Sequence, residues 1–209
     1  MEKKYNVEEQ RKWNDQDMWI DSGHEWSKHF GGTDKLWNDY LFDHLKQFRN
    51  KKILEIAPGF GRWTQYLSIL ASELVVIDLN QNCINQTQKK MKHHVHEYFV
   101  NDGKSLSDIK SLSKDLVFSF DSFVHMHSDV IEEYIKEINR VLITNGCSFI
   151  HHSWYHGGED QSFRNIDGRS NMTPELFKKF VESNGMTIVF QKEIKFLNVV
   201  DCLCLFVKS

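Results

Sequence analysis

A glycine-rich stretch, residues 51–66 (KKILEIAPGFGRWTQY), holds residue types that could bind a ligand. Its first half is an aliphatic run that predicts a strand, and from Arg62 onward apolar residues recur with helical spacing. Between the two, Gly59 and Gly61 permit backbone conformations closed to other residues and let a ligand approach closely. The helix start behind them offers unpaired N–H groups, and Glu55 suits an ammonium or ribose hydroxyl better than a pyrophosphate. The pattern predicts a pocket for a nucleotide-like molecule.

Two further acids follow predicted strands. Asp78, with Leu79 behind it, closes the apolar run 74–77, and an acid at this place of a strand-helix-strand unit hydrogen-bonds ribose hydroxyls. A surface-turn aspartate is the alternative. Asp102 stands in Asn-Asp-Gly after the predicted strand 93–100, a sequence that is by itself a good turn.

A dinucleotide-binding turn is the competing interpretation of the glycine stretch. Its G-x-G-x-x-G pattern would need a third glycine at Arg62 or Thr64, and neither position is glycine. The chain also lacks a second domain for the substrate of a nicotinamide-dependent oxidoreductase. That function is therefore disfavoured, though it stays an alternative.

Histidines stand at two predicted strand ends, where a doubly wound sheet places its ligands. His125 and His152 could each take a proton from an acceptor hydroxyl, since histidine titrates near neutral pH. His127 and His151 beside them are candidates for contacting the acceptor. The alternative for each is a hydrogen-bonded structural histidine. A metal site of these four histidines, with Asp121, is not predicted, because no carboxylate set has recognisable ligand spacing.

The order E-x-A-x-G-x-G followed by a helix resembles motif I of the class I S-adenosylmethionine-dependent methyltransferases, with alanine at position 57 where that family most often has glycine. The stretch 114–152 resembles motif IV, the following helix and the fifth strand, so the resemblance covers roughly residues 50–153. It implies S-adenosylmethionine as cofactor, S-adenosylhomocysteine as product, and an adenine contact at Asp102. The implied cofactor-binding residues are Glu55, Ala57, Gly59, Gly61, Asp78, Leu79, Asp102, Gly103, Phe120 and Trp26.

A narrower resemblance concerns the acceptor. The combination HEWSKHFGG, ILEIAPGFGRW, VNDG, FSFDSFVHMH and IHHS looks like bacterial methyltransferases that modify surface polysaccharides or sugars. It implies O-methylation of a hydroxyl, or of a phosphate-type group, on a nucleotide-activated saccharide. Methylation of another small molecule and a non-catalytic cofactor-binding subunit remain alternatives.

A long polar loop, residues 153–171, follows the fifth predicted strand. Loops of this length in a compact domain are usually functional or disordered. Its aromatic residues could stack on a sugar ring and its arginines could bind a phosphate; a lid without specific contacts is the alternative. The candidate acceptor-binding residues are therefore Trp154, Tyr155, Arg164 and Arg169, with His127 and His151.

Composition narrows the class of protein. The chain has 209 residues, which suits one domain, and a net charge of −3, which gives no electrostatic footprint for nucleic acid or an anionic membrane. No apolar run approaches the ~20 residues that cross a bilayer, so we expect a cytoplasmic protein. Its four cysteines lack metal-type spacing and are expected to be reduced core thiols. The oligomeric state is not indicated.

The expected architecture is an α/β domain spanning residues 1–209. A Rossmann-like doubly wound sheet occupies 51–209, and residues 1–50 form an N-terminal helical cap, with Thr33 capping a helix over 34–48. In the resembled family such an extension closes over cofactor and acceptor; Trp19 and Trp26 could instead only pack the helix onto the sheet. The resemblance implies seven strands, mostly parallel with the last antiparallel. The other expected helices are 62–71, 80–91, 129–142 and 176–184, and the later strands are 114–123, 147–152, 186–196 and 198–207.

Overall fold

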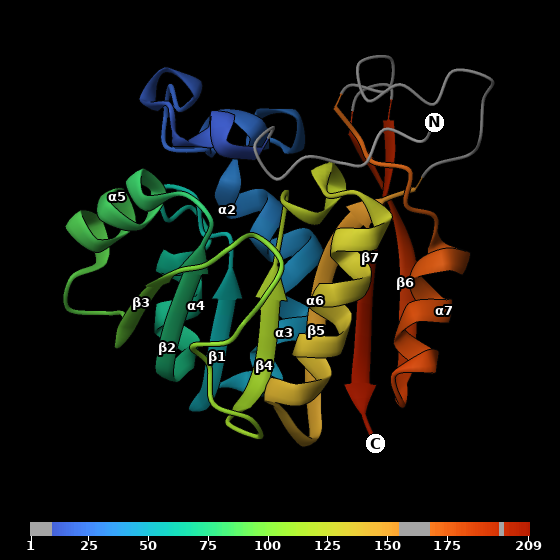
Figure 1. The fold of residues 1–209 in the computed structure, drawn as a ribbon. Coiled ribbons are helices and arrows are strands. Elements are labelled where there is room, and N and C mark those ends of the chain that lie inside the picture. Colours follow the sequence, from blue (N-terminus) through green and yellow to red (C-terminus); the bar gives the residue numbers. More distant parts are fainter. Residues whose placement is uncertain (1–9, 155–167, 197–198) are drawn as a thin grey trace.

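The computed structural model describes residues 10–154, 168–196 and 199–209. Seven strands form one sheet in the order β3-β2-β1-β4-β5-β7-β6 (Figure 1). The first five pair in parallel, and β7 runs antiparallel to both β5 and β6. The predicted Rossmann-like sheet with its last strand antiparallel is therefore confirmed. The strands are β1 (Lys51–Ile56), β2 (Ala71–Asp78), β3 (Glu97–Val100), β4 (Lys114–Ser119), β5 (Leu142–Ser153), β6 (Met186–Phe196) and β7 (Val199–Lys208).

Helices cover both faces of the sheet (Figure 1). On one face α6 (Ser128–Val141) and α7 (Pro174–Ser183) bury Ile131, Ile135 and Phe177 against the strands. On the other face the helical run 33–48, with α4 (Thr64–Leu70) and α5 (Gln81–Met91), buries side chains such as Leu41 and Leu67. The run 33–48 consists of α2 (Thr33–Leu36), η4 (Trp37–Leu41), α3 (Phe42–Leu45) and η5 (Lys46–Phe48).

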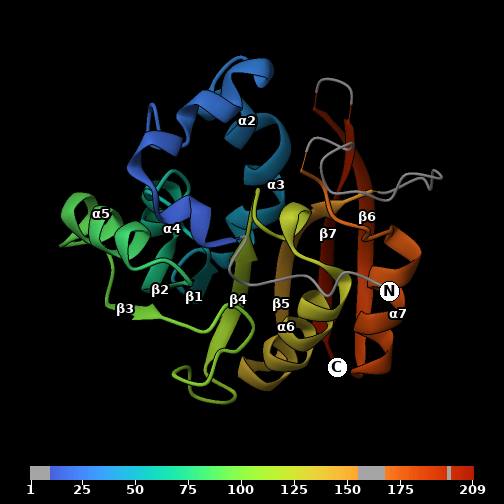
Figure 2. The same ribbon diagram turned by 45° about the horizontal axis from the view of Figure 1, so that its top comes forward.

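An N-terminal segment, residues 10–30, lies across the carboxyl ends of β1 and β2 (Figures 1 and 2). It contains the short helical turns η1 (Arg11–Asn14), η2 (Gln16–Met18) and η3 (His24–Phe30). Asn14 ties it to α5, because its side-chain oxygen accepts the Asn82 N–H at 2.9 Å. The segment therefore covers the edge where parallel strands present ligand-binding residues.

Two helix caps differ from the predictions. The spacing of Asp129 and Glu132 predicts a capping box, but helix α6 begins at Ser128 with His127 at the N-cap position, so this prediction is wrong. The Nδ1 atom of His127 instead lies 2.6 Å from the Asp129 carboxylate. Thr33 does not cap its helix either; its hydroxyl hydrogen-bonds Nδ1 of His24 at 2.7 Å. Both polar groups thus bond a histidine side chain, and Asp129 also accepts the Val130 N–H at 2.9 Å.

Strand β5 begins earlier than predicted. It follows α6 at once at Leu142. The glycine at 146 predicts a helix C-cap by its residue type, but Gly146 lies within the strand. The left-handed residue here is Asn145, with φ of 63°, at the register shift between β4 and β5. Glycine is needed at 146 for another reason, since a Cβ there would lie 2.9 Å from the Ile143 carbonyl oxygen.

The other observed element boundaries differ less from the predicted ones. Strand β3 starts at Glu97 rather than His93, and β4 ends at Ser119 before the single turn η6 (Phe123–His125). The four cysteines are free thiols, three of them buried. None of the helices in the described ranges combines the length and apolar character needed to cross a membrane.

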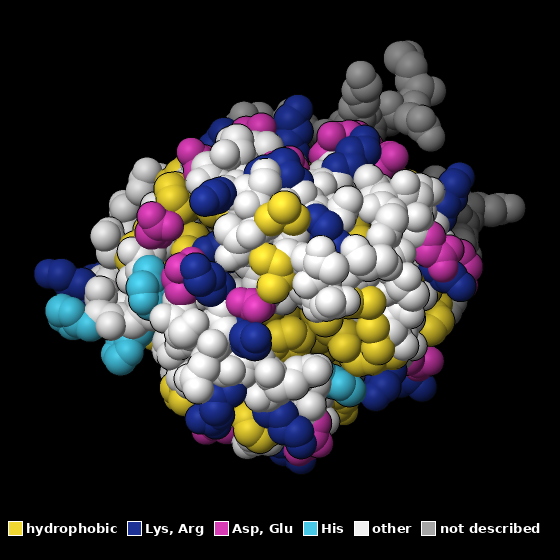
Figure 3. Space-filling model, turned by 90° about the horizontal axis from the view of Figure 1, so that it is seen from below, with side chains coloured by type: hydrophobic (Ala, Val, Ile, Leu, Met, Phe, Trp, Pro, Cys, Tyr) yellow, Lys and Arg dark blue, Asp and Glu magenta, His cyan; other side chains and the backbone are white. Residues whose placement is uncertain are grey.

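The lower end of the molecule, opposite the N-terminal segment, is shown in Figure 3. Basic and acidic side chains alternate across this face around a smaller apolar area. Charge of both signs spread in this way gives no single-sign field over the face.

Thr173 carries a stability prediction, because its hydroxyl accepts the Leu176 N–H at 3.2 Å and Pro174 fills the first turn of α7. Thr173→Ala is expected to lower the free energy of unfolding by ~1 kcal/mol. Ser183→Ala, on an exposed residue at the other end of α7, should change it by less than ~0.5 kcal/mol. Urea denaturation measures both; equal losses would show that the Thr173 cap does not stabilise the helix.

Candidate active site

A cavity of about 270 Å³ opens at the carboxyl edge of the sheet. Its walls come from the ends of β1, β2 and β4, from η6 and α6, and from the N-terminal segment. Its lining residues include Ala57, Gly59, Asp78, Leu79, Gly103, Phe120, Asp121, His125 and Arg169, together with Trp13, Trp19 and Trp26. Most of the residues expected to bind the cofactor, and some of those expected to bind the acceptor, therefore line this one cavity.

The turn after β1 depends on backbone conformations that favour glycine. Gly59 has φ of 56° and Gly61 has φ of 86°, while Ala57 adopts φ of 57° despite its side chain. A Cβ on Gly59 would lie 2.2 Å from Cη2 of Trp19, so only glycine lets the indole approach the turn. Gly61 does not line the cavity; it faces Thr87 of α5, whose hydroxyl donates to the Gly59 carbonyl at 2.8 Å.

Asp78 lies at the cavity as expected. Its carboxylate accepts the Asn80 N–H at 2.8 Å and the Gly59 N–H at 3.3 Å, which ties the end of β2 to the glycine turn. Burial raises the pKa of Asp78 to about 7, although these N–H groups oppose the shift. Beside it, the buried Oδ1 of Asn80 has no hydrogen-bond partner within the described residues. A hydroxyl or amine of a ligand would satisfy this acceptor.

Two more predicted cofactor residues, besides Gly61, lie outside the cavity lining. Glu55 is buried under the turn, where it accepts the Thr64 hydroxyl at 2.7 Å, and burial raises its pKa to about 8. Asp102 is exposed and accepts the N–H groups of Lys104 and Ser105. The adenine contact at Asp102 therefore stays a prediction, whereas its neighbour Gly103 does line the cavity.

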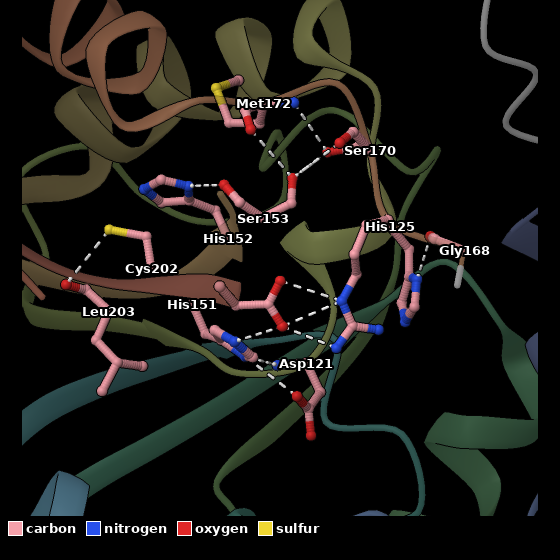
Figure 4. Close-up of polar contacts among 12 residues, drawn as sticks. Asp121, His125, His151, His152, Ser153, Gly168, Ser170, Met172, Cys202 and Leu203 are labelled. Atoms are coloured by element: carbon pink, nitrogen blue, oxygen red, sulfur yellow. Dashed lines mark hydrogen bonds and ion pairs between the residues drawn. The ribbon is translucent and has the colours of Figure 1, made fainter. Parts of the chain in front are cut away.

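His125 reaches the cavity from η6. Its Nδ1 lies 2.7 Å from the Gly168 carbonyl oxygen, which only accepts, so Nδ1 carries the proton and Nε2 holds the lone pair (Figure 4). Burial, followed by the charge of Arg169, lowers the pKa of His125 to about 4. The imidazole is therefore neutral at physiological pH and has the protonation state of a general base.

The remaining candidate histidines have other surroundings. His152 is fully buried away from the cavity, stacked on Phe177 at 4.1 Å, and burial lowers its pKa to about 3. His127 is the N-cap residue of α6. His151 lies behind the cavity wall, with Nδ1 3.1 Å from Asp121 and Nε2 3.4 Å from Asp201 (Figure 4). His152 does not line the cavity, so its catalytic role stays a prediction.

A chain of charged groups runs along and behind one wall of the cavity, and three of its members, Arg62, Asp121 and Arg169, line it. Arg62 pairs with Asp121, Asp121 with His151, His151 with Asp201, and Asp201 with Arg169, whose Nη2 donates at 2.8 Å. Burial lowers the pKa of His151, but the two carboxylates outweigh burial and raise it above the ordinary value. Arg62 and His151 in turn hold the pKa of Asp121 well below its usual range against the effect of burial.

Three tryptophans of the N-terminal segment cover the cavity. Trp13, Trp19 and Trp26 pack edge to face with ring centroids 4.9–6.2 Å apart, and Trp19 stacks on Phe60 of the glycine turn at 4.5 Å. Trp13 also lies 5.4 Å from the ring of His125. These indoles exclude water from the site while lining it with apolar surface.

Sequence reasoning missed Arg62 and Asn80 as site residues and considered Asp121 only for a metal. Arg62 directly follows the glycine turn, and this position could have indicated that it lies at the site. Its partners, Ser27 and Asp121, are far from it in the sequence. Trp154 does not line the cavity, Arg169 does, and Tyr155 and Arg164 lie outside the described residues. Within the ranges described, no group of three or more His, Cys, Asp or Glu residues is placed to hold a metal ion.

Part of the chain is similar to a known family. Residues 53–146, somewhat less than half of the chain, match the model of a family described as a methyltransferase domain. This match agrees with S-adenosylmethionine as the cofactor and makes the nicotinamide alternative the poorer one. The narrower resemblance to sugar O-methyltransferases is not part of the match.

Individual relatives are distant. A phosphoethanolamine N-methyltransferase of Triticum aestivum is 23% identical over 173 residues, which are 82% of this chain and 34% of the relative. The chain thus spans about a third of the length of the curated relatives that it matches. The N-methyltransferase NodS of Bradyrhizobium japonicum, solved with S-adenosylhomocysteine, superposes with a TM-score of 0.71 at 16% identity, covering 97% of each chain. The magnesium protoporphyrin IX methyltransferase of Synechocystis, also solved with S-adenosylhomocysteine, gives 0.68 at 11% identity, covering 98% of this chain and 100% of that one. The two structures share the fold.

The cavity at the carboxyl edge of the sheet fits S-adenosylmethionine. The cradle at Gly59, which a Cβ would fill, allows close backbone approach, and Asp78 with the unpartnered Oδ1 of Asn80 suits ribose hydroxyls or an amine. The buried indole N–H of Trp63, also in the lining, has no partner among the described residues and could donate to a carboxylate. Donors and acceptors that a nucleoside and an amino acid need are therefore both present.

Glu55 predicts how stability depends on pH. Its pKa of about 8 lies above the ordinary 4.5, so the folded chain keeps a proton that the unfolded chain loses between these values. The free energy of unfolding should therefore fall as pH rises from 5 to 8. In Glu55→Gln this fall should be smaller by about 1.4 kcal/mol or more, since each pKa unit contributes about that much.

Denaturation at several pH values measures this slope. Glu133→Gln, on an exposed residue of α6, is the control and should keep the slope of the wild type. Asp78, whose pKa is also raised, acts in the same direction and remains in both variants. Identical slopes for all three proteins would contradict the protonated state of Glu55.

Proposed function

We propose that this protein transfers the methyl group of S-adenosylmethionine to a small polar acceptor held beside His125 and Asp121. One observation carries the proposal. The neutral imidazole of His125 lines the same cavity as the glycine turn and Asp78, so a proton acceptor and a nucleoside-binding edge share one space. The tryptophans above them keep that space dry.

Methyl transfer asks mainly for alignment. When bound, S-adenosylmethionine supplies a methyl group on a positively charged sulfur, which is already activated for displacement. Gly59, Asp78 and Asn80 would hold the nucleoside part, and Trp13, Trp19 and Trp26 exclude water. The cavity would align an acceptor oxygen or nitrogen with that methyl group, and Nε2 of His125 would take the proton that the acceptor loses.

We infer that the acceptor is a saccharide hydroxyl, from the sequence resemblance and from the presence of a neutral histidine, His125, in the cavity. His125 is neutral, as removal of a hydroxyl proton requires, and Arg169 lines the cavity where a phosphate of an activated sugar could lie. Arg169 is anchored by a bidentate pair with Asp201, which orients its guanidinium. A low-molecular-weight acceptor also agrees with a net charge of −3, which does not favour nucleic acid.

An amine is the second candidate acceptor. The relative from Triticum aestivum is named for N-methylation of phosphoethanolamine, and this chain has a carboxylate in the cavity, that of Asp121, whose pKa is held low. An ionised carboxylate attracts an ammonium group and would orient it towards the cofactor. His125 would then accept the proton that an amine must lose before it attacks.

Cofactor binding is the first test. Calorimetric titration of the wild type with S-adenosylmethionine and S-adenosylhomocysteine should show binding, and Asp78→Asn should weaken it by about tenfold or more, since a hydrogen bond to a charged group contributes about 1.5–3 kcal/mol. Asp108→Asn, exposed in the loop after β3, should bind as the wild type does. Absence of binding to either compound, with binding of a nicotinamide nucleotide, would overturn the proposal in favour of redox chemistry.

Turnover tests His125. With saturating S-adenosylmethionine, production of S-adenosylhomocysteine is followed against nucleotide sugars, free sugars, phosphoethanolamine and ethanolamine. His125→Asn should reduce turnover of the active acceptor by about 10² to 10⁴ while cofactor affinity is unchanged, and His93→Asn, on an exposed histidine, should have no effect. A pKa of about 4 predicts a rate that does not rise between pH 6 and 8 on account of His125. Full activity of His125→Asn would show that another group takes the proton.

A further inference from the structure

Arg62 is a buried cation that contacts three separate parts of the chain. Only 4% of the residue is exposed, although it lies at the edge of the cavity. Its Nη1 donates to the hydroxyl of Ser27 at 3.1 Å, and its Nη2 forms an ion pair with Asp121. The guanidinium also lies 5.6 Å from the ring of Trp26 and 4.6 Å from that of Trp63.

The contacts on one side hold the N-terminal segment. Ser27 is fully buried within η3, and Trp26 beside it lines the cavity and packs on Trp13 and Trp19. Arg62 itself is fixed to the sheet, because it follows the glycine turn and packs on Trp63. One guanidinium therefore joins the tryptophans over the cavity to the turn beneath it.

The ion pair of Arg62 with Asp121 holds the carboxylate that lies beside the proposed acceptor. Asp121 follows β4 in a left-handed backbone conformation, with φ of 63°, which is uncommon for a residue with a side chain. Arg62 and His151 fix its carboxylate from two directions, and Asp121 lines the cavity. Its orientation thus depends on the same guanidinium that holds Ser27.

We propose that Arg62 is a positioning residue that couples closure of the N-terminal segment over the cofactor to the orientation of Asp121 at the acceptor. This proposal rests on the proposed function. A planar fork can donate to two partners in fixed directions and stack on indoles at the same time, which an ammonium group cannot do. Binding of the cofactor under the tryptophans then orders the acceptor side before the acceptor arrives.

Arg62→Lys separates this role from that of a simple counter-ion. Lysine keeps the positive charge near Asp121 but loses the fork, so the segment should open while the charge remains. The affinity for S-adenosylhomocysteine, measured by calorimetry, should fall about tenfold or more, as loss of a charge-assisted hydrogen bond implies. Trypsin cleavage at the exposed Arg11, Lys12 and Lys28 should become faster, and S-adenosylhomocysteine should protect these sites less than in the wild type.

Arg140→Lys is the matched control. Arg140 also pairs with a carboxylate, that of Glu137 at 2.8 Å, and donates to the carbonyls of Leu106 and Ile109, but it lies outside the cavity lining. This variant should keep the wild-type affinity and the wild-type cleavage pattern. Ser27→Ala removes only the partner in the N-terminal segment, so it should reproduce the faster cleavage even where Arg62→Lys does not fold.

The outcomes separate the two proposals. If the wild type binds neither S-adenosylmethionine nor S-adenosylhomocysteine, the proposed function fails. If the wild type binds and is protected from trypsin, while Arg62→Lys and Ser27→Ala match it in affinity and cleavage, the role of Arg62 is overturned and the function stands. Weaker binding with unchanged cleavage would likewise contradict a coupling through the N-terminal segment.

Discussion

The backbone reversal after β1 is the constraint on which the whole cavity depends. It needs left-handed conformations at residues 57, 59 and 61, and one of these, Ala57, adopts it with a Cβ, at a cost that glycine avoids. The reversal presents the Gly59 N–H to Asp78 and leaves room above the turn for Trp19. The positions of the glycine turn, Asp78 and the N-terminal segment therefore all depend on the backbone angles of these three residues.

The fold was predictable because each part of it leaves a local pattern. Continuous apolar runs in β2 and β4 reflect burial on both faces, and the periodic apolar residues of α6 reflect a helix packed on one side. Boundaries were less predictable, because they depend on competition between partners. Thr33 and Asp129 are both residue types that favour helix caps, yet neither takes the N-cap position. Thr33 bonds His24, and Asp129 bonds His127 as well as the Val130 N–H.

The site was predictable only where chemistry is local. The glycine turn and Asp78 stand at strand ends, so topology alone brings them together. The network of Arg62, Asp121 and Asp201 could not be found in this way, because its members are separated by long stretches of sequence. Asp201 joins the network only when β7 pairs with β5. Side-chain pairs of this kind depend on packing, which no spacing in the sequence encodes.

Strand geometry explains why neighbouring histidines differ so much. Successive residues of β5 point to opposite faces of the sheet, so His151 and His152 cannot both serve one site. His151 faces the carboxylates of Asp121 and Asp201, which favour its charged form, whereas His152 stacks on Phe177 beneath α7 and is kept neutral. A histidine held between two carboxylates is a poor proton acceptor near neutral pH, and His152, buried under a helix, is not part of the cavity lining. His125 lies outside the regular strand, is neutral and lines the cavity, which is why the proposed function gives it the role of base.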